Sequence, residues 1–137
     1  MTRILFDTNV ILDVILDRAP FILASSAAWA AAEHREPFLA AHALTTIHSL
    51  IQRDRGAKIA RDAIADLVTV YRVAAVDEAV VRRAISMDIR DFEDAITASA
   101  AESAGCEVIV TRDPRGFARS PIPFLTPEGL AAALSPR

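Results

Sequence analysis

The 137-residue chain has one cysteine, one lysine and only four glycines, and each scarcity excludes a class of protein. A lone Cys106 cannot build an intramolecular disulfide framework or a zinc site made of several thiolates. A chain without disulfides suits a reducing compartment, so we expect a cytoplasmic protein. The four glycines are scattered, which excludes the glycine-rich loops of dinucleotide-binding and P-loop proteins.

The chain also lacks a long hydrophobic run and a basic excess. No stretch reaches the roughly 18 consecutive apolar residues that a membrane helix needs. Asp7, Asn9 and Asp13 interrupt the apolar N-terminal segment, so we expect no secretory signal. The net charge of −3 disfavours a protein that coats nucleic acid through bulk charge. A nuclease is compatible with it, because acids that hold a metal cation dominate the local electrostatics.

The composition is 53% hydrophobic and 24% charged, with a mean hydropathy of +0.30, which favours one compact domain over residues 1–137. Strands are predicted at Ile4–Phe6, Phe38–Ala41, Tyr71–Val76, Glu107–Thr111 and Phe124–Leu125. Helices are predicted at Val10–Leu16, Phe21–Ala32, Leu44–Gln52, Lys58–Val70, Asp77–Met87, Asp91–Ala104 and from Thr126 onward. This alternation predicts a three-layer α/β fold, with a mostly parallel sheet of four to five strands flanked by about seven helices.

Acidic residues stand where strands of such a sheet end. Asp7 follows the first predicted strand directly, and Asp113 lies two residues beyond Thr111. Asp91 and Asp94 are three residues apart, so they share one face of the helix that they open. Ligands bind outside the carboxyl ends of parallel strands, which makes this edge the expected site. Each acid taken singly also has a structural interpretation, as a helix N-cap for Asp91 or a turn residue for Asp113.

Clustered carboxylates repel one another and take up protons unless a cation neutralises them. Ligand sets made only of oxygen atoms favour hard cations, Mg²⁺ or Mn²⁺. Such an ion can activate a water molecule and neutralise charge that grows on a phosphate. The acids therefore favour metal-dependent hydrolysis of a phosphodiester.

Several other polar residues have simpler interpretations. Asp13, Asp62 and Asp66 are expected to be solvated charges on helices. His42 and His48 are six residues apart, about 240° around a helix, so they do not readily share one ligand face. We expect both histidines to be partly exposed helix residues.

Three segments together resemble the PIN domain, the metal-dependent ribonuclease fold that includes the VapC-type toxins. They are Ile4-Leu5-Phe6-Asp7-Thr8-Asn9-Val10, Asp91-Phe92-Glu93-Asp94-Ala95-Ile96 and Val110-Thr111-Arg112-Asp113. The segments Ser120-Pro121-Ile122-Pro123 and Thr126-Pro127-Glu128 also resemble the family. The likeness spans nearly the whole chain, in the family's order and spacing.

The resemblance implies a role for each matching residue. The family's catalytic, metal-binding acids are matched by Asp7, Asp94 and Asp113, with Asp91 as an additional metal-site acid and Asn9 and Thr111 as supporting polar residues. It also implies Mg²⁺ or Mn²⁺ as cofactor, RNA as substrate, a cognate antitoxin as partner and a homodimer.

Arginines near the last acid are candidates for holding an RNA backbone. Arg112, Arg115 and Arg119 flank Asp113 and could contact phosphates. A solvated charged surface is an equally good interpretation of each of them.

One position departs from the family's pattern. PIN domains usually carry a glutamate on the helix after the second strand, and Thr46 stands there in this chain. One branch of PIN-like proteins has a neutral polar residue at this place, but the lost charge favours weaker or single-metal occupancy. Two functions stay open: a ribonuclease that is the toxin of a type II toxin–antitoxin pair, and a PIN-like protein that binds RNA or a partner without cutting.

The start of the chain is also similar to haloacid-dehalogenase-type phosphatases. Those enzymes need a second acid where Asn9 stands and a lysine later in the chain, whereas no lysine follows Lys58. The same absence argues against a phosphorylated receiver domain.

Overall fold

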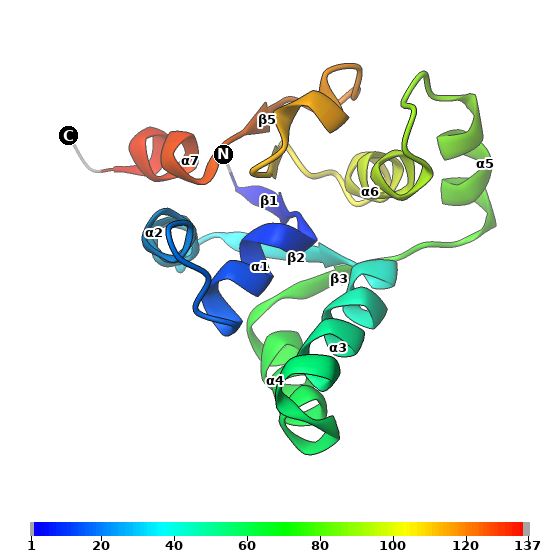
Figure 1. Cartoon of the computed structure of the whole chain (residues 1–137). Helices are drawn as coiled ribbons and strands as arrows, with labels where there is room; N and C mark the ends of the chain where they lie inside the picture. Colours follow the sequence, from blue (N-terminus) through cyan, green and yellow to red (C-terminus); the bar gives the residue numbers. More distant parts are fainter. Residues whose placement is uncertain (1, 136–137) are drawn as a thin grey trace.

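The computed structural model describes residues 2–135, in which a five-stranded parallel sheet is flanked by helices (Figure 1). The strands are β1 (Arg3–Phe6), β2 (Glu36–Ala40), β3 (Arg72–Ala74), β4 (Val108–Val110) and β5 (Phe124–Leu125). Their order is β3-β2-β1-β4-β5, and each neighbouring pair runs parallel. The predicted α/β fold is thereby confirmed.

Within residues 2–135 seven α-helices and one short 3-10 helix accompany the sheet. They are α1 (Thr8–Ile15), α2 (Ile22–Ala31), α3 (Ala41–Arg55), α4 (Ala57–Val70), α5 (Glu78–Ser86), α6 (Phe92–Ser103), the 3-10 helix η1 (Pro114–Phe117) and α7 (Pro127–Leu134). Figure 1 shows α1, α3 and α4 on one side of the sheet and α5 and α6 on the other. None of these helices is both long and apolar enough to cross a membrane.

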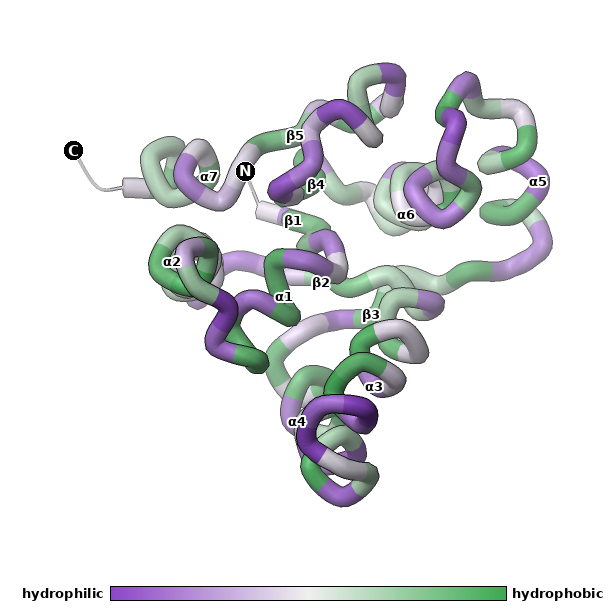
Figure 2. The backbone as a smooth tube through the Cα atoms, viewed as in Figure 1, coloured by the Kyte–Doolittle hydropathy of each residue, from purple (hydrophilic) through white to green (hydrophobic). Residues whose placement is uncertain are grey.

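The core lies between the sheet and its helices. Ile4, Leu5 and Phe6 of β1 are fully buried, as expected for a parallel strand covered on both faces. Figure 2 shows the hydrophobic residues concentrated in such inner segments, whereas the tip of the α3–α4 hairpin is hydrophilic. Helix α6 is unusually deep, because residues 95–101 are all buried. These are mostly alanine, serine and threonine, whose small side chains let α6 approach the sheet closely.

Capping residues define several helix ends where the sequence predicts them. The side chains of Asp77, Asp91 and Thr126 each accept a hydrogen bond from the backbone of the helix that follows. Gly105, with a φ of +74°, directly follows Ala104, the C-cap residue of α6. Asp7 caps α1, because its side chain accepts a hydrogen bond from the backbone N–H of Thr8. This cap places Asp7 at the junction of a strand and a helix.

Candidate active site

The site begins at two neighbouring strand ends. Phe6 pairs with Val110 in the β1–β4 register, so Asp7 and Thr111 emerge side by side from the sheet. The backbone N–H of Asp7 donates to the carbonyl of Val110 at 2.9 Å. The Thr111 hydroxyl donates to Oδ2 of Asp7 at 2.8 Å and accepts from the backbone N–H of Asp113 at 3.0 Å. Thr111 thus joins the two acids through a single hydroxyl.

Both carboxylate oxygens of Asp7 have hydrogen-bond donors. The backbone N–H of Thr8 donates to Oδ1 at 2.9 Å, and the Asn9 amide donates to Oδ2 at 3.4 Å. Burial nevertheless raises the pKa of Asp7 above its usual value, against the lowering effect of the Thr111 and Thr8 hydrogen bonds. Negative charge on Glu93 and Asp113 raises this pKa further. Hydrogen bonds therefore fix the position of the Asp7 carboxylate, and a nearby cation would stabilise its charged form.

The start of α6 supplies the next acids. Oδ1 of Asp91 accepts a hydrogen bond of 3.0 Å from the backbone N–H of Asp94, so Asp91 serves as the N-cap of α6. Burial raises the pKa of Asp94 to about 7, with further contributions from the charges of Asp7, Asp91, Asp113 and Glu93. These mutual effects place Asp94 within electrostatic reach of the acids at both strand ends.

A glycine makes room for two of these carboxylates. A Cβ atom on Gly116 would lie 2.5 Å from Oδ2 of Asp94 and 3.7 Å from Oδ2 of Asp113. The η1 segment can therefore approach the Asp94 carboxylate this closely only because position 116 has no side chain. Sequence reasoning missed this residue, although its place three residues after Asp113 was a usable signal. It also missed Glu93, which lies between Asp91 and Asp94 in the sequence.

Carboxylate oxygens are the donors that Mg²⁺ and Mn²⁺ prefer, so the acids fit a hard divalent cation in kind. In the described part of the chain, no three His, Cys, Asp or Glu side chains are close enough together to hold a metal ion by themselves. An ion at this edge would therefore take part of its coordination from water, as Mg²⁺ usually does.

Helix α3 carries Thr46 and the two histidines considered in the sequence. Thr46, which stands where PIN domains usually carry a glutamate, is partly buried on α3. Nε2 of His42 lies 3.2 Å from the hydroxyl of Thr97 on α6. Burial lowers the pKa of His42, while Glu93 acts in the opposite direction. His48 lines a separate hollow with residues of α4, so the two histidines do not share a face, as their spacing predicts.

Asp13 is not a solvated charge, and that prediction is wrong. Its side chain is fully buried and accepts hydrogen bonds from Nε and Nη2 of Arg112, at 2.6 and 3.2 Å, and from the hydroxyl of Ser25 at 3.0 Å. The Arg112 guanidinium also lies 3.8 Å from the centre of the Phe21 ring. The residue predicted to contact RNA phosphate instead binds a buried carboxylate within its own chain. Arg112 therefore ties the loop that carries Asp113 to α1.

The other predicted arginines face solvent. Arg119 pairs with Asp88 at 2.9 Å, and both side chains are largely exposed. A hollow of about 230 Å³ is lined by three arginines, Arg90, Arg115 and Arg119, and also by Asp88 and Gly116. Because a Cβ atom on Gly116 would lie within 3.7 Å of Oδ2 of both Asp94 and Asp113, this hollow is close to the two acids.

A parallel α/β sheet with acids beyond its strand ends is the arrangement expected of a PIN domain, and comparison of the sequence with family models gives the same family. The family model of the PIN domain matches residues 3–115, and the chain belongs to the PIN domain family. A comparison with curated proteins gives no significant match.

Solved structures of low sequence identity share the fold. VapBC2 from Rickettsia felis, bound to a DNA fragment from its promoter, contains a chain that is 11% identical, covers 91% of this chain and 98% of its own, and has a TM-score of 0.71. VapC20 from Mycobacterium tuberculosis, a toxin that cleaves the sarcin-ricin loop, is 20% identical over 84% of this chain and 93% of its own, with a TM-score of 0.69. DNA-bound VapBC from Salmonella typhimurium contains a chain that is 16% identical. The match covers 93% of this chain and 99% of the other, with a TM-score of 0.72.

Proposed function

We propose that the protein is an endoribonuclease that hydrolyses RNA phosphodiester bonds with Mg²⁺ or Mn²⁺, and that it is the toxin of a type II toxin–antitoxin pair. The observation that supports this proposal is the linkage between these acids: the Thr111 hydroxyl joins Asp7 to the backbone of Asp113, and a Cβ atom on Gly116 would lie 2.5 Å from Oδ2 of Asp94 and 3.7 Å from Oδ2 of Asp113. Burial raises the pKa of both Asp7 and Asp94, and the charges of neighbouring acids raise both pKa values further. Membership of the PIN domain family supports the same chemistry.

Asp7, Asp94 and Asp113 would hold the ion, and Asp91 would act through a water molecule. When bound, the ion supplies an activated water nucleophile and neutralises charge on the phosphate. Thr111 and Asn9 orient the Asp7 carboxylate through the hydrogen bonds that they donate to its Oδ2. Gly116 leaves room for the Asp94 carboxylate beside η1.

The RNA backbone would lie over the basic hollow next to the acids. Arg115 and Arg119 line it together with Arg90, which sequence reasoning did not single out. Guanidinium groups bind phosphate oxygens through paired hydrogen bonds, so this hollow would hold a phosphate beside the one that is cut. Arg112 does not line this hollow, and its guanidinium is bound to Asp13.

Two protein partners complete the proposal. The similar structures from Rickettsia felis and Salmonella typhimurium are VapBC assemblies, which supports an antitoxin as partner. An apolar hollow of about 270 Å³ between α1, α2 and α4 is a suitable surface for it, lined by Ile15, Trp29 and Leu67 among others. We also propose a homodimer, to which α2 would contribute Leu23, whose side chain is 81% exposed.

A cleavage assay tests the activity. The protein is incubated with structured RNA and Mg²⁺ or Mn²⁺, with EDTA and Asp7→Asn as negative controls and Asp66→Asn as a matched control on exposed α4. Cleavage by the wild type and by Asp66→Asn, lost in EDTA and in Asp7→Asn, is the expected result. Cleavage that persists in Asp7→Asn would assign the activity to a contaminant.

The second candidate function is binding of RNA or a partner without cleavage, and the neutral Thr46 in place of an acid favours it. RNA binding with no cleavage in either metal, together with no metal binding by calorimetry, would select this function over the nuclease.

A further inference from the structure

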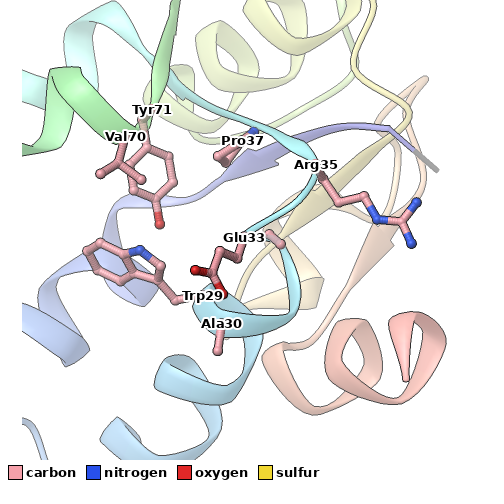
Figure 3. Close-up of a pocket in the computed structure, with 8 residues that line it drawn as sticks. Trp29, Ala30, Glu33, Arg35, Pro37, Val70 and Tyr71 are labelled. Carbon is pink, nitrogen blue, oxygen red and sulfur yellow. The ribbon is translucent and has the colours of Figure 1, made fainter. Parts of the chain in front are cut away.

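A pocket lies at the end of the sheet opposite to the acids. It has a volume of about 320 Å³ and is lined by Trp29 and Glu33, Pro37 at the start of β2, and Val70 and Tyr71 before β3 (Figure 3). Pro37 and Tyr71 mark the amino ends of their strands, whereas Asp7 and Thr111 follow the carboxyl ends of β1 and β4. This pocket is therefore separate from the candidate active site.

Tyr71 carries an unsatisfied hydroxyl in the wall of this pocket. Its side chain is only 3% exposed, and within residues 2–135 its hydroxyl has no hydrogen-bond partner. Edge-to-face contacts fix the ring, with centroid distances of 5.5 Å to Phe6 and 5.2 Å to Trp29. Figure 3 shows the hydroxyl directed toward the space beside Trp29. Burial raises the pKa of Tyr71, so the hydroxyl stays neutral and can accept or donate a hydrogen bond.

The surroundings of this hydroxyl favour positive charge. Helix α2 ends at Ala31 and α4 ends at Val70, so the carbonyl ends of two helices border the pocket. Glu33 adds a carboxylate, which Figure 3 shows on the same side as Trp29. Arg35 also lines the pocket, but its guanidinium points away from the aromatic pair (Figure 3).

We propose that this pocket binds a small organic cation, an alkylguanidinium or alkylammonium compound. The cation would lie against the indole of Trp29, donate a hydrogen bond to the Tyr71 hydroxyl and pair with Glu33. Its alkyl part would contact Val70 and Pro37. The volume is at the low end for small-molecule sites, which suits a ligand the size of one amino-acid side chain. This inference does not depend on the nuclease activity.

Butylguanidinium and butylammonium are the probes, and butylurea is a neutral compound of nearly the same shape as the first. Trp29 is the only tryptophan of the chain, so its fluorescence reports on binding beside it. Because Trp29 also lines the apolar hollow between α1, α2 and α4, substitutions of Tyr71 and Glu33, which line only the pocket of Figure 3, assign the signal. We expect saturable fluorescence changes with one or both cations and at least about tenfold weaker binding of butylurea. The two cations distinguish the planar guanidinium from the ammonium group.

Two mild variants test the contacts. Tyr71→Phe keeps the packed ring and removes the unpaired hydroxyl, and Glu33→Gln removes an exposed charge, so both should fold. Each should weaken cation binding about three- to tenfold, whereas Glu128→Gln, an exposed control, and Asp7→Asn should bind as the wild type does. Equal binding of butylurea and butylguanidinium, unchanged binding in both pocket variants, or no binding of any probe at millimolar concentration would overturn the proposal.

Discussion

At the scale of single residues, the raised pKa of Asp94 makes the folding stability of the protein depend on pH. Burial and the neighbouring acids raise its pKa to about 7, from an ordinary value of 3.8. Between about pH 4 and pH 7 the folded protein therefore binds the Asp94 proton while the unfolded chain has released it. Without a cation, the contribution of Asp94 to folding stability accordingly decreases as the pH rises through this range.

Asp94→Asn should remove this pH-dependent loss. In EDTA at pH 8, we expect its free energy of unfolding to exceed that of the wild type by about 1–2 kcal/mol, a figure reduced for the partial exposure of the group to solvent. The difference should shrink at pH 5, where the wild-type carboxyl is protonated in the folded state. Urea unfolding at both pH values measures it, with Asp66→Asn as the control. A variant less stable than the wild type at pH 8 would contradict the electrostatic explanation.

The role of Gly116 depends on the close approach of η1 to the Asp94 carboxylate. In Gly116→Ala, the new methyl group would lie 2.5 Å from Oδ2 of Asp94, so the carboxylate or η1 has to move. We expect RNA cleavage to fall by tenfold or more, with a loss of stability of about 1–2 kcal/mol.

Gly129→Ala is the matched control for this substitution. Its added Cβ is also crowded, 3.2 Å from the hydroxyl oxygen of Thr126, but no acid of the site is among its neighbours. Equal cleavage by the two alanine variants would show that crowding at Asp94 is irrelevant to activity.

Single residues were predictable from the sequence where their role follows from position along the chain. Asp7 and Asp113 follow strands, and Asp91 begins a helix. The role of Gly116 was not predictable, because it arises from the closeness of Gly116 to Asp94, 22 positions away in the sequence. The fate of Arg112 was not predictable either, since its partner Asp13 lies 99 positions away and looks like an ordinary helix charge in the sequence.

At the scale of elements, the contact between Asp13 and Arg112 connects α1 to the loop after β4. Oδ1 of Asn9 adds a second link, because it accepts a 3.3 Å hydrogen bond from the backbone N–H of Arg112. Since Asp113 directly follows Arg112, the position of this acid depends on both contacts. Asp13 is therefore a positioning residue for the site and not one of its ligands.

Asp13→Ala should destabilise the protein by about 3 kcal/mol, because it leaves the partly buried Arg112 without its carboxylate. Urea unfolding measures this loss. Asp62→Ala, which removes an exposed partner of Lys58, should cost less than about 1 kcal/mol. Adding Arg112→Met to Asp13→Ala should recover part of the stability. A loss as small as that of Asp62→Ala would mean that the buried pair does not hold the loop.

Element boundaries followed the sequence best where a capping residue marks them. Asp77, Asp91 and Thr126 begin their helices as predicted. The strand predicted at Tyr71–Val76 is only Arg72–Ala74 in the structure, because β3 has a single neighbour and pairs over three residues. Apolar sequence at Val76 continues past the pairing and packs against the core instead.

At the scale of the whole molecule, the two ends of the sheet have different chemistry. The carboxyl edge gathers acids beside a basic hollow, and the amino edge holds the aromatic pocket with Tyr71. The alternation of strands and helices predicted this fold. The strands were recognisable because parallel strands that are buried on both faces are continuous apolar runs in the sequence. The pocket was not predictable, because Trp29, Glu33 and Tyr71 come together only through the packing of α2 and α4 on the sheet.

The proposed homodimer gives a further test at this scale. If α2 contributes to the interface, Leu23→Glu should shift the protein from dimer to monomer in sedimentation equilibrium, because it buries a charge there. Val68→Glu on α4, also at an exposed apolar position, should leave the dimer intact. A wild-type protein that sediments as a monomer at all concentrations would contradict the homodimer itself.

Titration of Mn²⁺ into the RNA-free protein, followed by calorimetry, tests the central claim most directly. The wild type and Asp66→Asn should bind the ion saturably, and Asp7→Asn, Asp94→Asn and Asp113→Asn should each bind it at least about tenfold more weakly. Wild-type affinity in any one of these three variants would mean that the acids do not act on a shared ion, and would contradict the account of the site.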